Sequence, residues 1–251
     1  MITLLCHFFN ERLLMPYFCR HHYPLFDHGI MIDYGSNDGT VEIIKELAPN
    51  WEIRPSRNAY FHAIEIDQEV MQIENTVPGW KVCLNTTEFI LHNDLRGVVS
   101  PVEGPACFGM RQTILFDRSE DVENELTDEP LFFQKQYGYI GDLGQIGRGP
   151  RFLHNHANGV YAAGRHSTEH RWTEHPDLLI AWFGLCPRKW MAERRGGQKT
   201  KINPPTMPSG LGFHLFWDDD TYEAFFKNKV RDPYGDLLQN PAYTRVLDKL
   251  R

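Results

Sequence analysis

The segment His28–Thr40 constrains the fold of this chain more than any other stretch of its sequence. It reads HGIMIDYGSNDGT, and its apolar run Ile30–Ile32 ends in Asp33. A turn-rich stretch with two glycines then leads into the apolar-periodic run Val41–Leu47. This order predicts a buried strand, a loop and a helix. Because ligands of open α/β sheets bind at the carboxyl ends of strands, Asp33 is predicted to face a binding crevice.

The same alternation of strand-like and helix-like patterns runs through the first 90 or so residues. It predicts an α/β fold, Rossmann-like, with a mixed, mostly parallel sheet flanked by helices. The expected strands are Ile2–Phe9, Ile30–Asp33, Trp51–Arg54 and Trp80–Leu84. The expected helices are Glu11–His21, Thr40–Leu47 and Tyr60–Asn75. Later strand candidates are found within Val98–Phe116 and at Val160–Gly164 and Leu178–Phe183, and a last helix is expected at Thr221–Lys229.

Composition restricts the class of protein. A chain of 251 residues that is 41% hydrophobic suits one globular domain. The formal net charge of -7 disfavours a nucleic-acid partner. Five cysteines without CxxC spacing are typical of reduced thiols in a reducing compartment. Since no apolar run approaches the ~20 residues of a membrane helix, we expect no transmembrane segment and a cytoplasmic location.

Polar residues follow the first two expected strands. Phe9 can stack on a base, and Asn10 and Glu11 can bond its edge, although a strand end with Asn10 as helix N-cap explains the same letters. Asp33 can accept hydrogen bonds from a nucleobase or a ribose hydroxyl. The alternative for Ser36 and Asp38 is an Asx-type turn that caps the next helix. We favour a binding role here because both features occur at a strand-to-helix crossover.

The strand Trp80–Leu84 ends in a set of oxygen-bearing side chains. Asn85, Thr87 and Glu88 suit magnesium or manganese, but a single carboxylate with two neutral oxygens makes a weak metal site. Histidines are candidates for metal or phosphate contact, notably those beside glycines: His166 and His214. The basic run at 188–201 can neutralise a diphosphate or simply form a solvated face.

Taken together, these motifs carry a family resemblance. The stretch HFFNERLLMPYFCRHHYPLFDHGIMIDYGSNDGTVEII resembles the N-terminal half of family-2-like glycosyltransferases with the glycosyltransferase-A fold. The strand at Trp80–Phe89 fits the next family landmark, which usually ends in D-x-D-E-F. The resemblance covers about the first 90 residues well and the rest loosely, through GRHS, the basic run and GLGFH.

The resemblance implies a nucleotide-diphosphate sugar donor and an inverting transfer of its sugar to a glycan, lipid-linked or other hydroxyl acceptor. One domain is implied, with residues 1–95 binding the donor and residues 96–251 shaping the acceptor side and ending in a helix. From the motifs and the resemblance together, the expected donor-binding residues are Phe9, Asn10, Glu11, Asp33, Ser36, Asp38, Asp67, Lys199 and Lys201.

The chain departs from the family at the expected metal-binding motif, because it has Asn85-Thr86-Thr87 where the family has D-x-D. Three readings follow. Manganese or magnesium is held weakly by Asn85, Thr87, Glu88 and His214; or the basic run replaces the metal; or the protein is inactive. The expected catalytic residues are Glu120 and Asp121, as an acidic pair that includes a general base, and His166. For the acidic pair, an exposed loop is the alternative.

Two other functions remain open from the sequence. The Asp33–Thr40 loop also resembles the glycine loop of S-adenosylmethionine-dependent methyltransferases, where it normally ends the first strand of the sheet. In this chain the strand Leu4–Glu11 precedes the Asp33–Thr40 loop, which favours a glycosyltransferase. The second alternative is a non-catalytic module that binds sugar nucleotides or glycans, and the missing aspartates support it.

Overall fold

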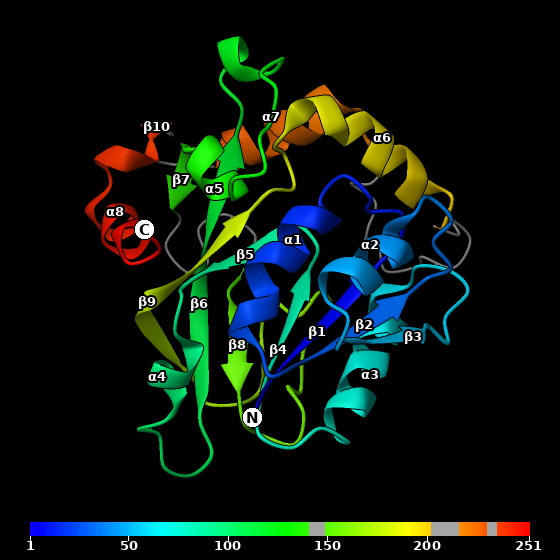
Figure 1. Ribbon diagram of the computed structural model, residues 1–251, viewed down its shortest axis with the longest axis vertical. Helices are drawn as coiled ribbons and strands as arrows, with labels where there is room; N and C mark the ends of the chain where they lie inside the picture. Colours follow the sequence, from blue (N-terminus) through cyan, green and yellow to red (C-terminus); the bar gives the residue numbers. More distant parts are fainter. Residues whose placement is uncertain (141–148, 202–215, 230–234) are drawn as a thin grey trace.

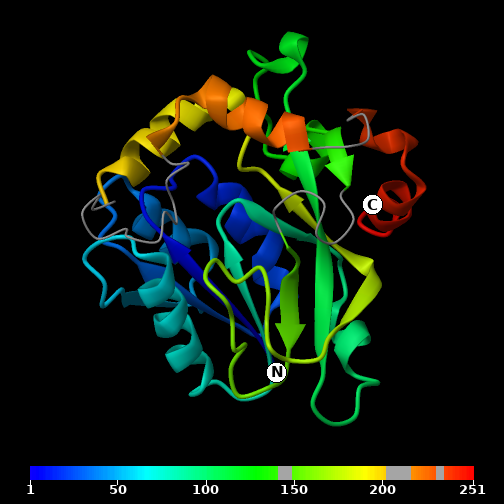
Figure 2. The ribbon, with the colours of Figure 1, turned by 180° about the vertical axis from the view of Figure 1, so that it is seen from behind.

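The computed structural model describes residues 1–140, 149–201, 216–229 and 235–251. It has one mixed sheet whose strands follow the order β10-β7-β6-β8-β4-β1-β2-β3, with helices on both faces (Figures 1 and 2). The predicted α/β class is confirmed. The strands are β1 Ile2–Phe8, β2 His28–Asp33, β3 Glu52–Pro55, β4 Trp80–Asn85, β5 Glu88–Leu91, β6 Cys107–Phe116, β7 Tyr137–Ile140, β8 Arg151–His154, β9 Thr173–Trp182 and β10 Gly235–Asp236. The α-helices are α1 Met15–His22, α2 Thr40–Leu47, α3 Ala63–Glu74, α4 Leu95–Val99, α5 Leu131–Gln134, α6 Arg188–Lys199, α7 Asp219–Lys229 and α8 Pro241–Asp248.

The parallel part of the sheet is built by the first half of the chain. Strands β3, β2, β1 and β4 pair side by side in parallel. Alternate residues of β1 face opposite sides: Leu4 packs with the α1 and α2 side chains, while Leu5 packs with Val70 of α3. These helices therefore cover both faces of the parallel strands, as the sequence pattern predicts.

The chain adds its strands first on one side of β1 and then on the other side. Strand β1 pairs with β2 on one side and with β4 on the other, so the chain builds β2 and β3 and then returns. In register, Phe8 lies opposite Asp33, and His7 lies opposite Asn85. The carboxyl ends of β1, β2 and β4 thus meet at the place where open α/β sheets bind ligands.

The second half of the chain adds mainly antiparallel pairings. Strand β8 joins β4 to β6 antiparallel, and β9 runs parallel to β6 and antiparallel to β5. Helices α6 and α7 run across the top of the molecule in both ribbon views, above the carboxyl ends of β1 and β4 (Figures 1 and 2). The basic run at 188–199 is therefore the helix α6 and not an irregular surface segment.

The expected strand at Val160–Gly164 is wrong. This stretch forms a single bridge between Tyr161 and Thr168. Val160 has a φ of 42°, Gly164 of 86° and Arg165 of 57°, and these left-handed values interrupt an extended ladder. The segment instead makes a compact turn after β8.

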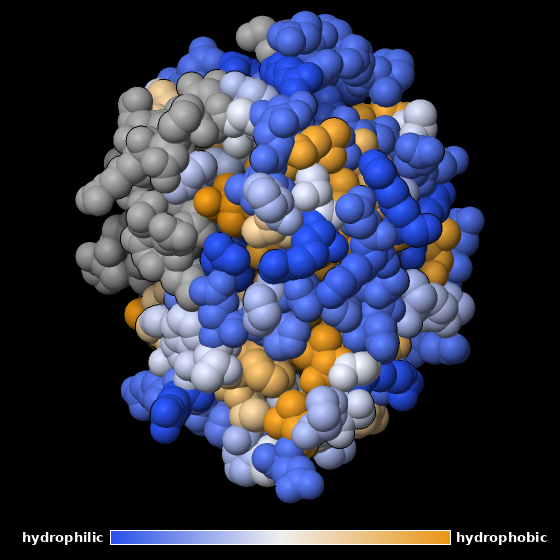
Figure 3. Space-filling view, turned by 90° about the vertical axis from the view of Figure 1, so that its left-hand side faces the viewer, coloured by the Kyte–Doolittle hydropathy of each residue, from blue (hydrophilic) through white to orange (hydrophobic). Residues whose placement is uncertain are grey.

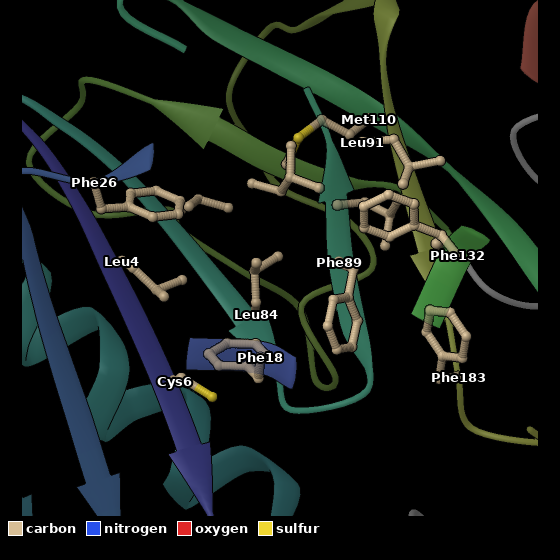
Figure 4. Packing of buried hydrophobic residues seen from close by; sticks show 14 of the residues in the cluster. Leu4, Cys6, Phe18, Phe26, Leu84, Phe89, Leu91, Met110, Phe132 and Phe183 are labelled. Atoms are coloured by element: carbon tan, nitrogen blue, oxygen red, sulfur yellow. The ribbon is translucent and has the colours of Figure 1, made fainter. Parts of the chain in front are cut away.

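The main core lies between α1 and the strands β4, β5 and β9. Figure 4 shows Phe18 of α1 beside Cys6 and Leu84, with Phe89 between Phe18 and Phe183. Ring centroids of Phe89 lie 5.9 Å from Phe18 and 5.1 Å from Phe183, both edge-on. Such aromatic contacts add to the burial of apolar surface and fix how α1 sits on the sheet.

The surface is mostly hydrophilic on the face shown in Figure 3, where apolar residues form separate small groups. None of the helices in the described part of the chain combines the length and apolarity that crossing a bilayer requires.

Candidate functional site

The loops that follow β1 and β2 are bound to each other. The Asn10 amide N–H donates to Ser36 Oγ (3.0 Å), and the Asn37 N–H donates to Asn10 Oδ1 (2.9 Å). The Glu11 N–H donates to Thr40 Oγ1 at 2.9 Å. Asn10 adopts a φ of 50°, which the asparagine side chain tolerates better than most others. The two predicted donor-binding segments therefore form one fixed surface.

Asp33 and Asp38 have different surroundings. Asp38 accepts from the Thr40 N–H (3.0 Å) and, from the other loop, the Arg12 N–H (3.1 Å), which matches the capping alternative. Asp33 accepts the Ser36 N–H through Oδ1 at 2.9 Å and is half-buried. No hydrogen bond from the described residues reaches its Oδ2. Asp33 therefore keeps an acceptor atom for a ligand, whereas Asp38 shapes the loop.

Glu11 fastens helix α6 to the end of β1. Arg194 donates to its carboxylate through Nε (2.8 Å) and Nη2 (3.0 Å), and Gln198 Nε2 donates at 3.1 Å. Glu11 is only 2% exposed. The sequence predicted Glu11 as a direct donor contact, but its oxygens are occupied by α6. The carboxylate needs these partners because burying an unpaired charge is costly.

Lys201 lies over both loops. Its Nζ is 4.7 Å from the centroid of the Phe9 ring, and a Cβ built on Gly35 would lie 3.8 Å from that Nζ. The Lys201 carbonyl accepts the Phe61 N–H at 2.7 Å, which ties this segment to the loop before α3. Lys199, the last residue of α6, is exposed. The structure thus brings Lys201 together with the residues predicted beside it.

A cavity of about 240 Å³ adjoins this surface, in the loop between β3 and α3. The loop is joined to β2 because the Ser56 N–H donates to the Asp33 carbonyl at 2.7 Å. Tyr60 is 54% exposed, so one aromatic ring is available there. Sequence reasoning missed this site because its residues form no motif. The lining residues are Arg57, Asn58, Ala59, Tyr60, His62 and Glu65.

Glu69 of α3 organises the inner side of that loop. Its carboxylate accepts from Ser56 Oγ (2.7 Å), the Arg57 N–H (2.8 Å) and Asn58 Nδ2 (2.8 Å). His7 of β1 places Nε2 3.7 Å from it. Although burial opposes the charged form, His7, Arg57 and Ser56 lower the pKa of Glu69 to about 2. Glu69 is therefore a negatively charged side chain that links His7 of β1 to the loop lining the cavity.

Glu88 and Asn85, two of the three metal ligands predicted at the end of β4, are occupied by other partners. Glu88 is fully buried, and Arg151 Nε donates to both of its oxygens (2.9 and 2.8 Å). Asn85 Oδ1 accepts from Arg165 Nη2 at 2.9 Å. Thr87 accepts the Phe183 N–H through its backbone carbonyl at 2.7 Å, and its side-chain oxygen alone would be a weak ligand. This donor set does not fit a divalent cation, because its charged oxygens already bind a guanidinium.

Within the described residues, no three His, Cys, Asp or Glu side chains are grouped so that they could hold a metal. The remaining predicted ligand, His214, lies outside the described residues.

Asp67, predicted beside the donor, holds the turn after β8. It accepts the Gly164 N–H at 2.6 Å and pairs with Arg165, and its side chain is almost fully buried. Burial lowers the pKa of Arg165, but neighbouring groups, Cys83 and Asp67 foremost, together raise it by more than burial lowers it. The guanidinium therefore stays charged. Asp67 therefore positions Arg165 at the crevice and has no oxygen left for a ligand without giving up one of these contacts.

The predicted catalytic residues are not brought together. Glu120 and Asp121 lie in a 3-10 turn, Ser119–Asp121, where Asp121 Oδ1 accepts from Asn124 Nδ2 at 2.9 Å. Among the described residues, no hydrogen bond or ion pair connects either carboxylate with the β1 and β2 loops. His166 follows Arg165, and its Nδ1 lies 3.1 Å from the Gly149 carbonyl. Their catalytic role stays a prediction.

Comparisons with known proteins give only distant likeness. No family model and no curated protein matches the chain. Among solved structures, S. aureus TarS 1-349 in complex with UDP is 10% identical with a TM-score of 0.46, over 92% of this chain and 81% of that one. HddC from Yersinia pseudotuberculosis is 7% identical with a TM-score of 0.43, over 77% and 99%. A longer S. aureus TarS chain is matched over 22% of its length and 47% of this chain, at 11% identity and a TM-score of 0.38. The function proposed below therefore rests on the residues of this chain.

Proposed function

We propose that the protein is a glycosyltransferase of the glycosyltransferase-A type that uses a nucleoside-diphosphate sugar as donor. One observation carries the proposal: Lys201 lies over the Phe9 ring and over Gly35, which is two residues after Asp33 in the chain. A cation, an aromatic ring, a glycine turn and a carboxylate at the carboxyl ends of parallel strands suit the parts of a nucleotide. The resemblance of the first 90 or so residues supports the same class.

Each group has a proposed task. Asp33 Oδ2 accepts a hydrogen bond from the base or a ribose hydroxyl, and the cavity at residues 57–65 receives the base. Tyr60 at its edge offers a stacking surface. Lys201 neutralises the diphosphate as a point charge. Phe9 and the Asn10–Ser36 contact keep this surface in shape, while Glu11 positions α6.

The proposed reaction transfers the sugar with inversion. A bond forms between the acceptor hydroxyl oxygen and the anomeric carbon, and the bond from that carbon to the phosphate oxygen breaks. The hydroxyl proton passes to a general base, and the nucleoside diphosphate leaves with the electron pair. We assign the base to the acidic pair Glu120 and Asp121, with residues 96–251 shaping the acceptor side.

The methyltransferase alternative is less well supported. The Asp33 loop follows the second strand of the sheet, whereas the comparable loop of methyltransferases normally ends the first. S-adenosylmethionine also carries a positive sulfonium, which Lys201 would repel. A non-catalytic binding module uses the same donor surface, so turnover distinguishes it from the enzyme.

A donor screen tests the proposal. The protein is incubated with uridine, guanosine, thymidine and adenosine diphosphate sugars, and release of the nucleoside diphosphate is measured with and without simple glycan acceptors. We expect one nucleotide class to be consumed, and Lys201→Met to slow its release. If no donor binds while S-adenosylmethionine does, the proposal is wrong. If a donor binds but is never consumed, the non-catalytic module is correct.

A further inference from the structure

We infer, on the basis of the proposed function, that two buried arginines close the end of β4 to divalent cations and that donor binding is independent of metal. The arginines are Arg151 and Arg165. The diphosphate charge is met by Lys201, on the segment after α6.

Arg151 binds Glu88, which carries the only carboxylate among residues 85–88. Its Nε reaches both oxygens of Glu88, and its Nη1 donates to the carbonyls of Gly164 (2.6 Å) and Arg165 (2.9 Å). Glu88 Oε2 also accepts the Asn85 N–H at 2.8 Å. Both side chains are at most 1% exposed. A cation that bound Glu88 would leave the buried guanidinium of Arg151 without its counter-charge. An uncompensated buried charge strongly destabilises a protein.

Arg165 occupies the neighbouring position. Its guanidinium pairs with Asp67 and donates to Asn85 Oδ1, so a fixed positive charge lies where a cation would approach Asn85. The backbone of Arg165 has a φ of 57°, an unfavourable value for this residue. Such a conformation persists only where its surroundings hold it, and here Arg151 binds the Arg165 carbonyl itself. The two arginines form one interlocked unit.

This unit lies at the carboxyl end of β4. Asn85 is opposite His7 in the β1–β4 register, and Phe9 and Asn10 follow the end of β1. The internal ion pairs leave little net charge of their own to offset a diphosphate. Lys201 supplies positive charge beside the Phe9 ring, on the segment that follows helix α6, and Glu11 and Arg194 hold that helix in place.

Titration with Mn²⁺ tests whether the end of β4 binds a divalent cation, and it requires no enzymatic turnover. Electron paramagnetic resonance of free Mn²⁺ is recorded while the wild-type protein is titrated in. We expect the free-ion signal to stay undiminished at micromolar concentrations. A loss of signal equal to one ion per chain, absent in Glu88→Gln, would overturn the inference.

Calorimetry tests the donor side. The nucleoside diphosphate selected by the donor screen is titrated in EDTA and in Mn²⁺, and its Kd is expected to agree within about twofold. Lys201→Met should weaken binding about tenfold or more in EDTA, while Lys45→Met, on the exposed side of α2, should not. Binding that disappears in EDTA and returns with Mn²⁺ overturns the inference. If no nucleoside diphosphate binds under either condition, the proposed function fails, and the manganese titration alone decides whether the edge is closed.

Discussion

Glu11 and Arg194 form a buried ion pair between residues that are 183 positions apart in the chain. The Arg194 Nε and Nη2 atoms lie 2.8 and 3.0 Å from the two carboxylate oxygens, and the side chains are 3% and 6% exposed. The pair joins the end of β1 to helix α6. Since Lys201 follows α6, the same pair sets where that lysine lies over the Phe9 ring.

Breaking this pair should lower the stability of the protein. Glu11→Gln leaves Arg194 buried without its counter-charge, so we expect the free energy of unfolding to fall by about 3–5 kcal/mol. Urea unfolding measures the loss. The matched control is Glu193→Gln, which breaks the exposed pair with Arg12 and should cost less than about 1 kcal/mol. Equal effects of the two substitutions would show that the buried pair does not hold α6.

Asp33 and Asp38 should respond differently to substitution. Asp33→Asn keeps an oxygen for the Ser36 N–H but removes the charge, so we expect donor affinity to fall about tenfold with little change in stability. Asp38→Ala removes hydrogen bonds to the Thr40 and Arg12 amides and should lower stability by about 1–2 kcal/mol. Calorimetry and thermal unfolding separate the two effects. Unchanged nucleotide affinity in Asp33→Asn would remove Asp33 from the site.

Stability should decline in mild acid through His21. Burial lowers the pKa of His21 to about 4, although its Nε2 lies 2.6 Å from the Ile90 carbonyl. In the unfolded chain the pKa is about 6.5, so between pH 6.5 and 4 the unfolded state binds a proton that the folded state does not. The contribution is complete above pH 6.5 and is lost as pH falls towards 4, by up to about 3 kcal/mol. Urea titrations at pH 7.5, 5.5 and 4.5 measure it, and His21→Gln should reduce the pH dependence, because burial of His22 and His7 lowers their pKa values as well. An unchanged slope in that variant would contradict the assignment.

Two glycines should respond oppositely to alanine. A Cβ on Gly29 would lie 2.3 Å from Cδ2 of Trp51, so Gly29→Ala should destabilise the protein by about 1–3 kcal/mol. No atom of the described residues lies within 4 Å of a Cβ built on Gly196 in α6, and Gly196→Ala should stabilise by about 0.5–1 kcal/mol. Thermal unfolding gives both signs. A neutral Gly29→Ala would mean that Trp51 can move aside.

The sequence predicted the first half of the fold well because its strands and helices carry strong apolar periodicity. The helix Thr40–Leu47 is found with the predicted bounds, and β1, β2 and β4 differ by one or two residues at their ends. It also brought Asp33, Asn10 and Lys201 into one site. These predictions depend on local pattern, or on the general rule that parallel strands end at a common edge.

The polar interior of the site could not be predicted in the same way. Arg151 meets Glu88 over 63 positions, and Arg165 meets Asp67 over 98, so no local pattern marks either pair. The turn at 160–165 failed as a strand prediction because its left-handed residues include Val160, a β-branched residue typical of strands. The cavity at 57–65 arises from a loop fold around Glu69, which no spacing reveals.

The central claim is that the surface formed by Phe9, Asp33 and Lys201 binds a nucleoside diphosphate. Titration calorimetry of the wild-type protein against uridine, guanosine, cytidine and adenosine diphosphates, with S-adenosylmethionine in parallel, tests it most directly. We predict saturable binding of at least one diphosphate, weakened about tenfold in Lys201→Met, and none of S-adenosylmethionine. Binding of S-adenosylmethionine alone, or diphosphate binding that Lys201→Met leaves unchanged, would contradict the claim.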